Sequence, residues 1–164
     1  MDLTIEPMHP GDWDAMRVIY QEGIDTGHAT LEVTAPEWEK WDTAHLEICR
    51  LVAKRDGQVL GWAALTPVSS RAVYAGVAEV SVYIGAAARG QGVGKALLNA
   101  LIAESERCGL WTLQGHILAE NSPSLALVAA CGFRTVGCRE KLGQLNGVWK
   151  DTILVERRSS IVGI

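Results

Sequence analysis

Alternating apolar and polar positions predict strands in the first half of the chain. Residues 3–7 alternate and are soon followed by a Pro-Gly turn signal, which indicates a short first strand. Apolar runs on both sides of Asp56-Gly57 predict an antiparallel hairpin, because Asp-Gly suits the left-handed positions of a tight turn. The alternation returns over 77–84 and predicts a third consecutive strand.

Helical spacing of apolar residues is found between and after these strands. It covers residues 12–23, and a capping pattern at Thr34 predicts a second, short helix. Residues 92–107 follow the same period. A fourth helix is expected to begin near Asn121 and to end at Gly132, since Asn is a good cap and Gly a common stop.

The order of these elements predicts the fold class. Further strand patterns lie at 110–118, 133–143 and 147–158. Consecutive strands, followed by alternating strands and helices, predict a mixed α/β sheet with a parallel section near its middle. A length of 164 residues suits one domain, so residues 1–164 are expected to form a single one.

Composition and charge narrow the class of protein. Hydrophobic residues make up 48% of the chain and charged residues 21%, as is typical of soluble globular proteins. The net charge of −4 argues against nucleic acid as a partner. The four cysteines form no CxxC pair, so neither a metal site nor a disulfide framework is indicated. No leader pattern and no apolar run long enough to span a bilayer is found, so a cytoplasmic protein without membrane contact is expected.

The stretch VSVYIGAAARGQGVGKALL, residues 80–98, passes from a strand through a glycine-rich turn into a helix. Such a turn presents unpaired N–H groups at the positive end of a helix dipole, which suits a phosphate group. Arg89 and Lys95 add positive charge, and a purely structural turn is the alternative. A Walker A loop would need glycine at position 89 and a hydroxyl at 96, and a dinucleotide fingerprint would need glycine at 95. Neither pattern fits.

The pattern that fits is R-G-x-G-x-G, and with it the chain resembles the GNAT superfamily of N-acetyltransferases. Downstream, AENSPSLALVAACGF resembles a second GNAT segment, N-x-x-[AS]-x-x-L-x-x-x-x-G-F. Within the superfamily, SSRAVYAGVAEVSVYI and GVWKDT are similar to the phosphinothricin acetyltransferase-like family. The resemblance implies the GNAT fold, a mixed central sheet of about seven strands flanked by about four helices.

The resemblance also implies acetyl-CoA as co-substrate, without a metal. The strand before the loop is expected to bind the pantetheine arm through its main chain, and its N–H groups could stabilise the oxyanion formed at the thioester. The loop is expected to bind the pyrophosphate. Asn121 matches a cofactor-binding residue, and a helix cap is its alternative role. The implied cofactor-binding residues are Val82, Tyr83, Ile84, Arg89, Gly90, Gln91, Gly92, Val93, Gly94, Lys95 and Asn121.

Three further residues match the acceptor side of the family's site. Glu79 aligns with the proposed general base, which the reaction needs because an ammonium group must lose a proton before its nitrogen attacks. Alternation alone leaves open whether Glu79 faces a cleft or solvent. Arg71 is expected to bind an acidic group of the acceptor, with a solvated loop arginine as the alternative, and Tyr74 is expected to line the acceptor pocket.

Two departures from the family pattern affect these expectations. Val128 occupies a position at which the superfamily often has Tyr and the phosphinothricin-like family His, so no acid is assigned for the CoA thiolate. Asn146 also stands in place of a frequent His, which argues against strict phosphinothricin specificity.

The sequence thus predicts an N-acetyltransferase that acts by direct transfer in a ternary complex. The expected acceptor is a small amino acid-like amine such as phosphinothricin, methionine sulfoximine or methionine sulfone. The alternatives are another acceptor (a polyamine, an aminoglycoside or a protein N-terminus) and a non-catalytic acyl-CoA-binding module. The family is often dimeric, and the C-terminal strands could supply the interface of a homodimer.

Overall fold

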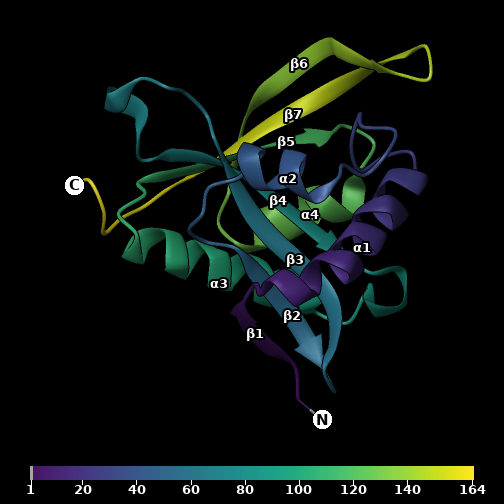
Figure 1. Cartoon of the computed structure of the whole chain (residues 1–164). Coiled ribbons are helices and arrows are strands. Elements are labelled where there is room, and N and C mark those ends of the chain that lie inside the picture. Colours follow the sequence, from purple (N-terminus) through teal and green to yellow (C-terminus); the bar gives the residue numbers. More distant parts are fainter. Residues whose placement is uncertain (1) are drawn as a thin grey trace.

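The computed structural model describes residues 2–164 and contains one seven-stranded sheet flanked by four α-helices (Figure 1). The strand order is β1-β2-β3-β4-β5-β7-β6, and each neighbouring pair is antiparallel except β4 and β5. The predicted mixed sheet with a central parallel section is confirmed. Its strands are β1 (Thr4–Pro7), β2 (Leu51–Arg55), β3 (Gln58–Pro67), β4 (Val77–Ile84), β5 (Thr112–Leu118), β6 (Arg134–Leu145) and β7 (Val148–Arg158).

The helices follow the predicted order, with one corrected boundary. The second helix has Glu37, not Thr34, as its N-cap. The Ala35 N–H donates to the Gln21 side chain of α1 at 3.0 Å, and this tertiary contact holds the segment before the helix. None of the helices in the described range is long and apolar enough to cross a bilayer. The α-helices are α1 (Trp13–Asp25), α2 (Trp38–Ala44), α3 (Val93–Arg107) and α4 (Ser122–Ala130), with 3₁₀ turns at Pro10–Asp12, Ala72–Tyr74 and Ala86–Ala88.

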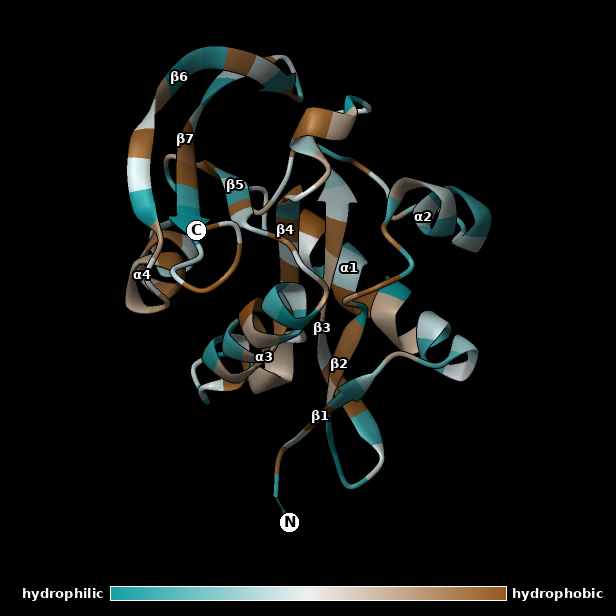
Figure 2. Cartoon of the chain, turned by 90° about the vertical axis from the view of Figure 1, so that its left-hand side faces the viewer, coloured by the Kyte–Doolittle hydropathy of each residue, from teal (hydrophilic) through white to brown (hydrophobic). Residues whose placement is uncertain are grey.

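Two hydrophobic clusters lie on opposite faces of the central strands. In β3, Ala63 and Leu65 belong to the cluster that includes Leu97 of α3. Trp62, which points to the other face, belongs to the cluster that includes Met16 of α1. Hydrophobic residues dominate β4 and much of β2, whereas the turn between β2 and β3 is hydrophilic (Figure 2). The strand alternation thus gives each face a separate core, since successive side chains point to opposite sides.

The Asp-Gly turn between β2 and β3 confirms the prediction, and the Asn-Gly turn between β6 and β7 has the same geometry. Asp56 and Gly57 have φ angles of 52° and 78°, and Asn146 and Gly147 have φ angles of 49° and 79°. These left-handed pairs match the twist of the strands that they join. Asn146 therefore has a conformational role at the end of the β6–β7 hairpin, because Asn tolerates the left-handed region better than most residues.

The parallel pair β4 and β5 is joined over a short segment. Residues 77–79 pair with 112–114, and the pairing then stops. Beyond this point β4 continues to pair with β3, and β5 continues to pair with β7. The two central strands therefore separate. The main-chain groups of Val80, Val82 and Ile84 face the gap, because those of the intervening residues point to β3.

Candidate active site

A cavity of about 550 Å³ lies where β4 and β5 separate. Segment 29–32, which precedes α2, lines it together with both strands and Leu142 of β6. Leu31 packs on the same hairpin, where a Cβ on Gly143 would lie 2.5 Å from the Leu31 Cδ1. The N-terminal segment and the C-terminal hairpin thus meet at this cavity. Four of the residues predicted for the site line it: Glu79, Val82, Tyr83 and Asn121.

Glu79 lies in this cavity, which settles its orientation. Its side chain is about one third exposed. The Glu79 Oε1 accepts a hydrogen bond from the Gln114 Nε2 at 3.1 Å, and the His116 Nδ1 lies 2.7 Å from the same oxygen. No hydrogen bond from residues 2–164 reaches Oε2. One oxygen of the Glu79 carboxyl group is therefore held by two side chains, and the other has no partner among the described residues.

Sequence reasoning missed Gln114 and His116. Both follow from the register of β4 and β5, because Glu79 is paired with Gln114 and side chains two residues apart in a strand share a face. A polar pair at 114 and 116 inside an otherwise apolar strand was the available signal. The His116 Nε2 is buried and has no hydrogen-bond partner among the described residues.

The glycine loop connects β4 to α3 outside this cavity. Gly90 and Gly92 have φ angles of 72° and 81°, and a Cβ on either would meet no atom within 4 Å. Their bare backbone is therefore open to a ligand. Arg89 and Lys95 are exposed at the same loop. Arg55 was not predicted here, and its Nη1 donates to the Gln91 Oε1 at 3.1 Å.

Val93 and Gly94, at the end of the loop, pack against the rest of the protein. Val93 is 1% exposed and belongs to the core beneath α3, so it could contribute to binding through its backbone alone. A Cβ on Gly94 would lie 3.2 Å from a methyl group of Leu127, which shows close contact between α3 and α4. The first half of the loop thus carries the open surface, and the second half anchors the helix.

Comparison with known proteins identifies the family. Residues 13–133 match the Acetyltransferase (GNAT) family. The chain belongs to this family. It is 37% identical to a phosphinothricin N-acetyltransferase of Alcaligenes faecalis, over 94% of this chain and 81% of the relative. It is 31% identical to an L-methionine sulfoximine/L-methionine sulfone acetyltransferase of Salmonella typhimurium, over 65% of this chain and 62% of the relative.

A solved structure gives the same assignment. The GNAT chain matches a phosphinothricin acetyltransferase from Sinorhizobium meliloti, in complex with acetyl-CoA, with a TM-score of 0.89. The two are 29% identical, and the match covers 99% of this chain and 91% of the other. The predicted GNAT fold, the resemblance to phosphinothricin acetyltransferases and the classification as an acetyltransferase are therefore confirmed.

Two stacked tyrosines, Tyr20 and Tyr83, line one side of the cavity, and Trp62 packs against them. Tyr83 stacks on Tyr20 with ring centroids 4.6 Å apart and on Trp62 at 4.9 Å. Gly23 of α1 makes room for this arrangement, since a Cβ there would lie 2.7 Å from the Tyr83 ring. Burial raises the pKa of Tyr83 and of Tyr20 above the ordinary tyrosine value, so both phenols remain uncharged at neutral pH.

Asn121 has the helix-cap role that the sequence left open, and its cofactor-binding role stays a prediction. Its Oδ1 accepts a hydrogen bond from the Ser124 N–H at 3.3 Å and caps α4, and the residue is buried against the cavity. Val128 of the same helix also lines the cavity. Its side chain has no proton to give, so α4 places an apolar group without a proton donor in the cavity.

Arg71 and Tyr74 are close to each other but do not line the cavity of the single chain. The Arg71 guanidinium carbon lies 5.3 Å from the centre of the Tyr74 ring, and both residues are exposed. Their loop joins β3 to β4 at the end where Glu79 lies, because Thr66 pairs with Glu79. The predicted acceptor role of the two residues stays a prediction.

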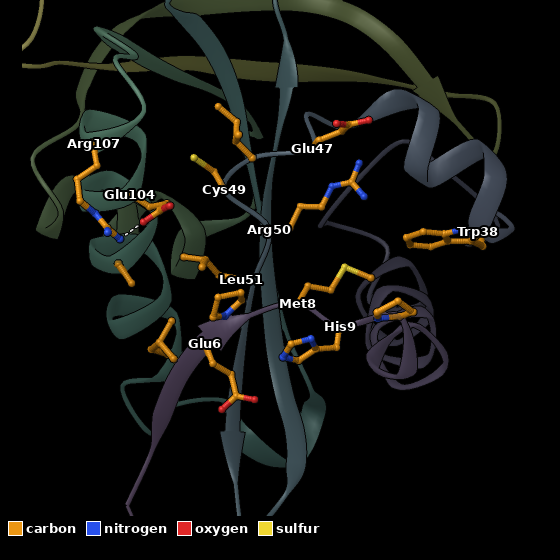
Figure 3. Close-up of a pocket in the computed structure, with 15 residues that line it drawn as sticks. Glu6, Met8, His9, Trp38, Glu47, Cys49, Arg50, Leu51, Glu104 and Arg107 are labelled. Carbon is orange, nitrogen blue, oxygen red and sulfur yellow. Dashed lines mark hydrogen bonds and ion pairs between the residues drawn. The ribbon is translucent and has the colours of Figure 1, made fainter.

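A second hollow, of about 670 Å³, lies near β1, the start of β2 and α3 (Figure 3). None of the predicted site residues lines it. Its two arginines are neutralised by carboxylates, because Arg107 pairs with Glu104 and Arg50 pairs with Asp42. This hollow therefore lacks the free positive charge that the phosphates of acetyl-CoA would require.

Proposed function

We propose that this GNAT chain transfers the acetyl group of acetyl-CoA directly to the primary amine of a small amino acid-like acceptor in a ternary complex. Phosphinothricin, methionine sulfoximine and methionine sulfone are the candidate acceptors, since relatives are named for them. The carrying observation is Glu79, a hydrogen-bonded carboxylate in a cavity at the point where β4 and β5 separate.

Different residues carry out the separate steps of the proposed reaction. Glu79 accepts a proton from the acceptor ammonium, and the freed nitrogen forms a bond to the acetyl carbon. Backbone N–H groups of Val82 and Ile84 stabilise the negative charge on the carbonyl oxygen, because β5 does not pair with them, whereas the main-chain groups of Tyr83 point to β3. The carbon–sulfur bond then breaks. Val128 has no proton to donate, but the CoA thiolate can leave without a dedicated acid because thiols have a low pKa. The attacking nitrogen loses its second proton to water as the amide forms, and water returns a proton to the thiolate.

The glycine loop fits the other end of acetyl-CoA. The open backbone of Gly90 and Gly92 precedes α3, whose N-terminus favours negative charge. Arg89, Lys95 and the newly found Arg55 add three cations around this backbone. The proposed pyrophosphate site therefore rests on charge and access. Asn121, which lines the cavity, is a further proposed contact of acetyl-CoA.

Replacing Arg89 with alanine is expected to weaken acetyl-CoA binding by about 10-fold, because one charge-assisted contact is lost at an exposed site. Titration calorimetry at two salt concentrations checks this result, and the loss should shrink at high salt. Lys40→Ala is the matched control, since Lys40 is an exposed cation on α2. Equal affinity for acetyl-CoA in Arg89→Ala and Lys40→Ala proteins would contradict the proposed pyrophosphate site.

The acceptor class is tested with a panel of amines and an assay for free CoA thiol. We expect turnover with phosphinothricin, methionine sulfoximine or methionine sulfone. Release of CoA with none of these amines would refute the acceptor assignment. Acetyl-CoA binding without turnover over the whole panel would instead support a non-catalytic acyl-CoA-binding module.

A polycationic amine is the second candidate acceptor, and one observation favours it. The two fully charged residues that line the cavity, Glu32 and Glu79, are both acidic, whereas Arg71 lies outside the lining. An acidic cavity attracts cations and repels carboxylates. Spermidine and an aminoglycoside therefore belong in the amine panel, and higher kcat/KM for them than for the amino acid-like acceptors would reverse the assignment.

We also propose a cytoplasmic homodimer. Strand β6 pairs with β7 on one side, lies at the edge of the sheet and leaves an open row of main-chain groups. Val136, Val148 and Trp149 expose apolar surface on this hairpin. Cys108 and Cys138 are exposed as free thiols, which suits a reducing compartment.

A further inference from the structure

The contact between Glu79 and His116 carries an inference about how the carboxylate is held. We propose that His116 is a positioning residue for Glu79: it donates its Nδ1–H to Oε1 and so leaves Oε2 to the acceptor amine. The distance of 2.7 Å is that of a strong hydrogen bond. This inference rests on the proposed function, in which Glu79 is the base.

The tautomer of His116 follows from the surroundings of its two ring nitrogens. An ionised carboxylate only accepts hydrogen bonds, so the proton of the neutral ring lies on Nδ1. The Nε2 is buried without a partner among the described residues. A proton on Nε2 would therefore be an N–H without an acceptor, which is costly in a buried place. Contact and burial both select the neutral ring with Nδ1–H.

The position of His116 makes it suited to this role. Gln114 and His116 belong to β5, and both act on Oε1 at the point where β5 separates from β4. They hold Glu79 across the gap from two directions along one strand. A carboxylate with free rotation would lose this geometry, and small misplacements of reacting groups are costly.

The other imidazole at the cavity does not serve Glu79. The His45 Nδ1 lies 2.6 Å from the Trp41 carbonyl oxygen, and its ring stacks on Trp41 with centroids 4.2 Å apart. Burial lowers the pKa of His45 below the ordinary histidine value. Of the two imidazoles that line the cavity, His116 is therefore the one that contacts the proposed base.

The charged groups around His116 come from four elements. Glu79 faces it from β4, and Glu32 lies on the segment that lines the same cavity. On β7, Glu156 pairs in register with Gln114 and is bound to Arg134 of β6. Below the range in which imidazole titrates, a protonated His116 would pair with the Glu79 carboxylate as a cation and repel the acceptor ammonium. Activity is therefore expected to fall at acid pH partly through His116.

Two substitutions separate positioning from packing. His116→Leu removes the donor and is expected to lower kcat by about 10–100-fold, with the acetyl-CoA dissociation constant unchanged. His116→Asn is of similar size to Leu but keeps an N–H donor near Nδ1, so it should recover most of the lost kcat. Its acid limb should also move to lower pH, because an amide does not titrate. His9→Leu, at an exposed histidine, is the control.

Kinetics and spectroscopy give distinct ways to overturn the inference. Equal losses in His116→Leu and His116→Asn proteins, with an unmoved acid limb, would show a packing role. Nitrogen NMR of ¹⁵N-histidine protein tests the contact without turnover: Nδ1 is expected to carry the proton in the wild type, and the Nδ1 signal is expected to shift in Glu79→Leu protein, which lacks the acceptor. An Nε2–H tautomer in the wild type would refute the inference. The Nδ1–H tautomer without turnover on any amine would support the contact and refute the proposed function alone.

Discussion

Glu79→Gln protein is expected to show a kcat lower by about 10²–10⁴-fold, with acetyl-CoA bound as tightly as by the wild type. Glutamine keeps the size of the side chain and can still accept the bonds that Gln114 and His116 donate to Oε1. It cannot take a proton from the acceptor ammonium. The substitution therefore removes one chemical step and leaves the cavity intact.

The pH dependence makes this expectation specific. The loss of kcat should shrink as the pH approaches the range in which the free acceptor amine loses its own proton, since a base is then no longer needed. Steady-state kinetics from pH 6 to about pH 10 with the best acceptor of the amine panel measures this effect. Glu140→Gln, at an exposed carboxylate of β6, is the matched control. An unchanged rate profile in Glu79→Gln protein would remove Glu79 from the mechanism.

Much of the fold could be predicted because its signals are local. Alternation and turn residues predict strands directly, and Asp56-Gly57 has the predicted left-handed angles. The start of the second helix could not be predicted in this way. Thr34 has the chemistry of a cap, but the contact from Ala35 to Gln21 comes from another helix and replaces the local preference.

In the candidate site, too, the residues with local sequence signals could be predicted and those that depend on tertiary contacts could not. Glu79 and the loop around Gly92 could be found because they lie within continuous motifs. His116 could not, because its contact with Glu79 depends on the pairing register of two strands, in which Glu79 is aligned with Gln114, 35 residues further along the chain. Arg71 matches a family position, but whether it reaches an acceptor depends on surroundings that lie outside the cavity of one chain.

Trp62 packs in the hydrophobic core and against Tyr83, which lines the cavity. It is 0% exposed, stacks on Tyr83 and meets Trp41 edge to face with ring centroids 5.6 Å apart. Trp62→Ala is expected to lower the free energy of unfolding by about 3–5 kcal/mol, because it removes a large buried side chain from a site that several rings surround. Urea unfolding followed by circular dichroism measures this loss without relying on tryptophan fluorescence.

Trp62→Phe provides the matched control and links stability to function. Phenylalanine keeps a ring against Tyr83 and removes the indole N–H, which is buried without a partner among the described residues. We therefore expect it to cost less than half as much as Trp62→Ala. If Tyr83 depends on this support, Trp62→Ala protein that still folds should show a raised KM for the acceptor and an unchanged dissociation constant for acetyl-CoA. Equal free energies of unfolding for the wild type and Trp62→Ala protein would contradict this role of the ring. They would mean that the surrounding aromatic rings close the space that the indole leaves.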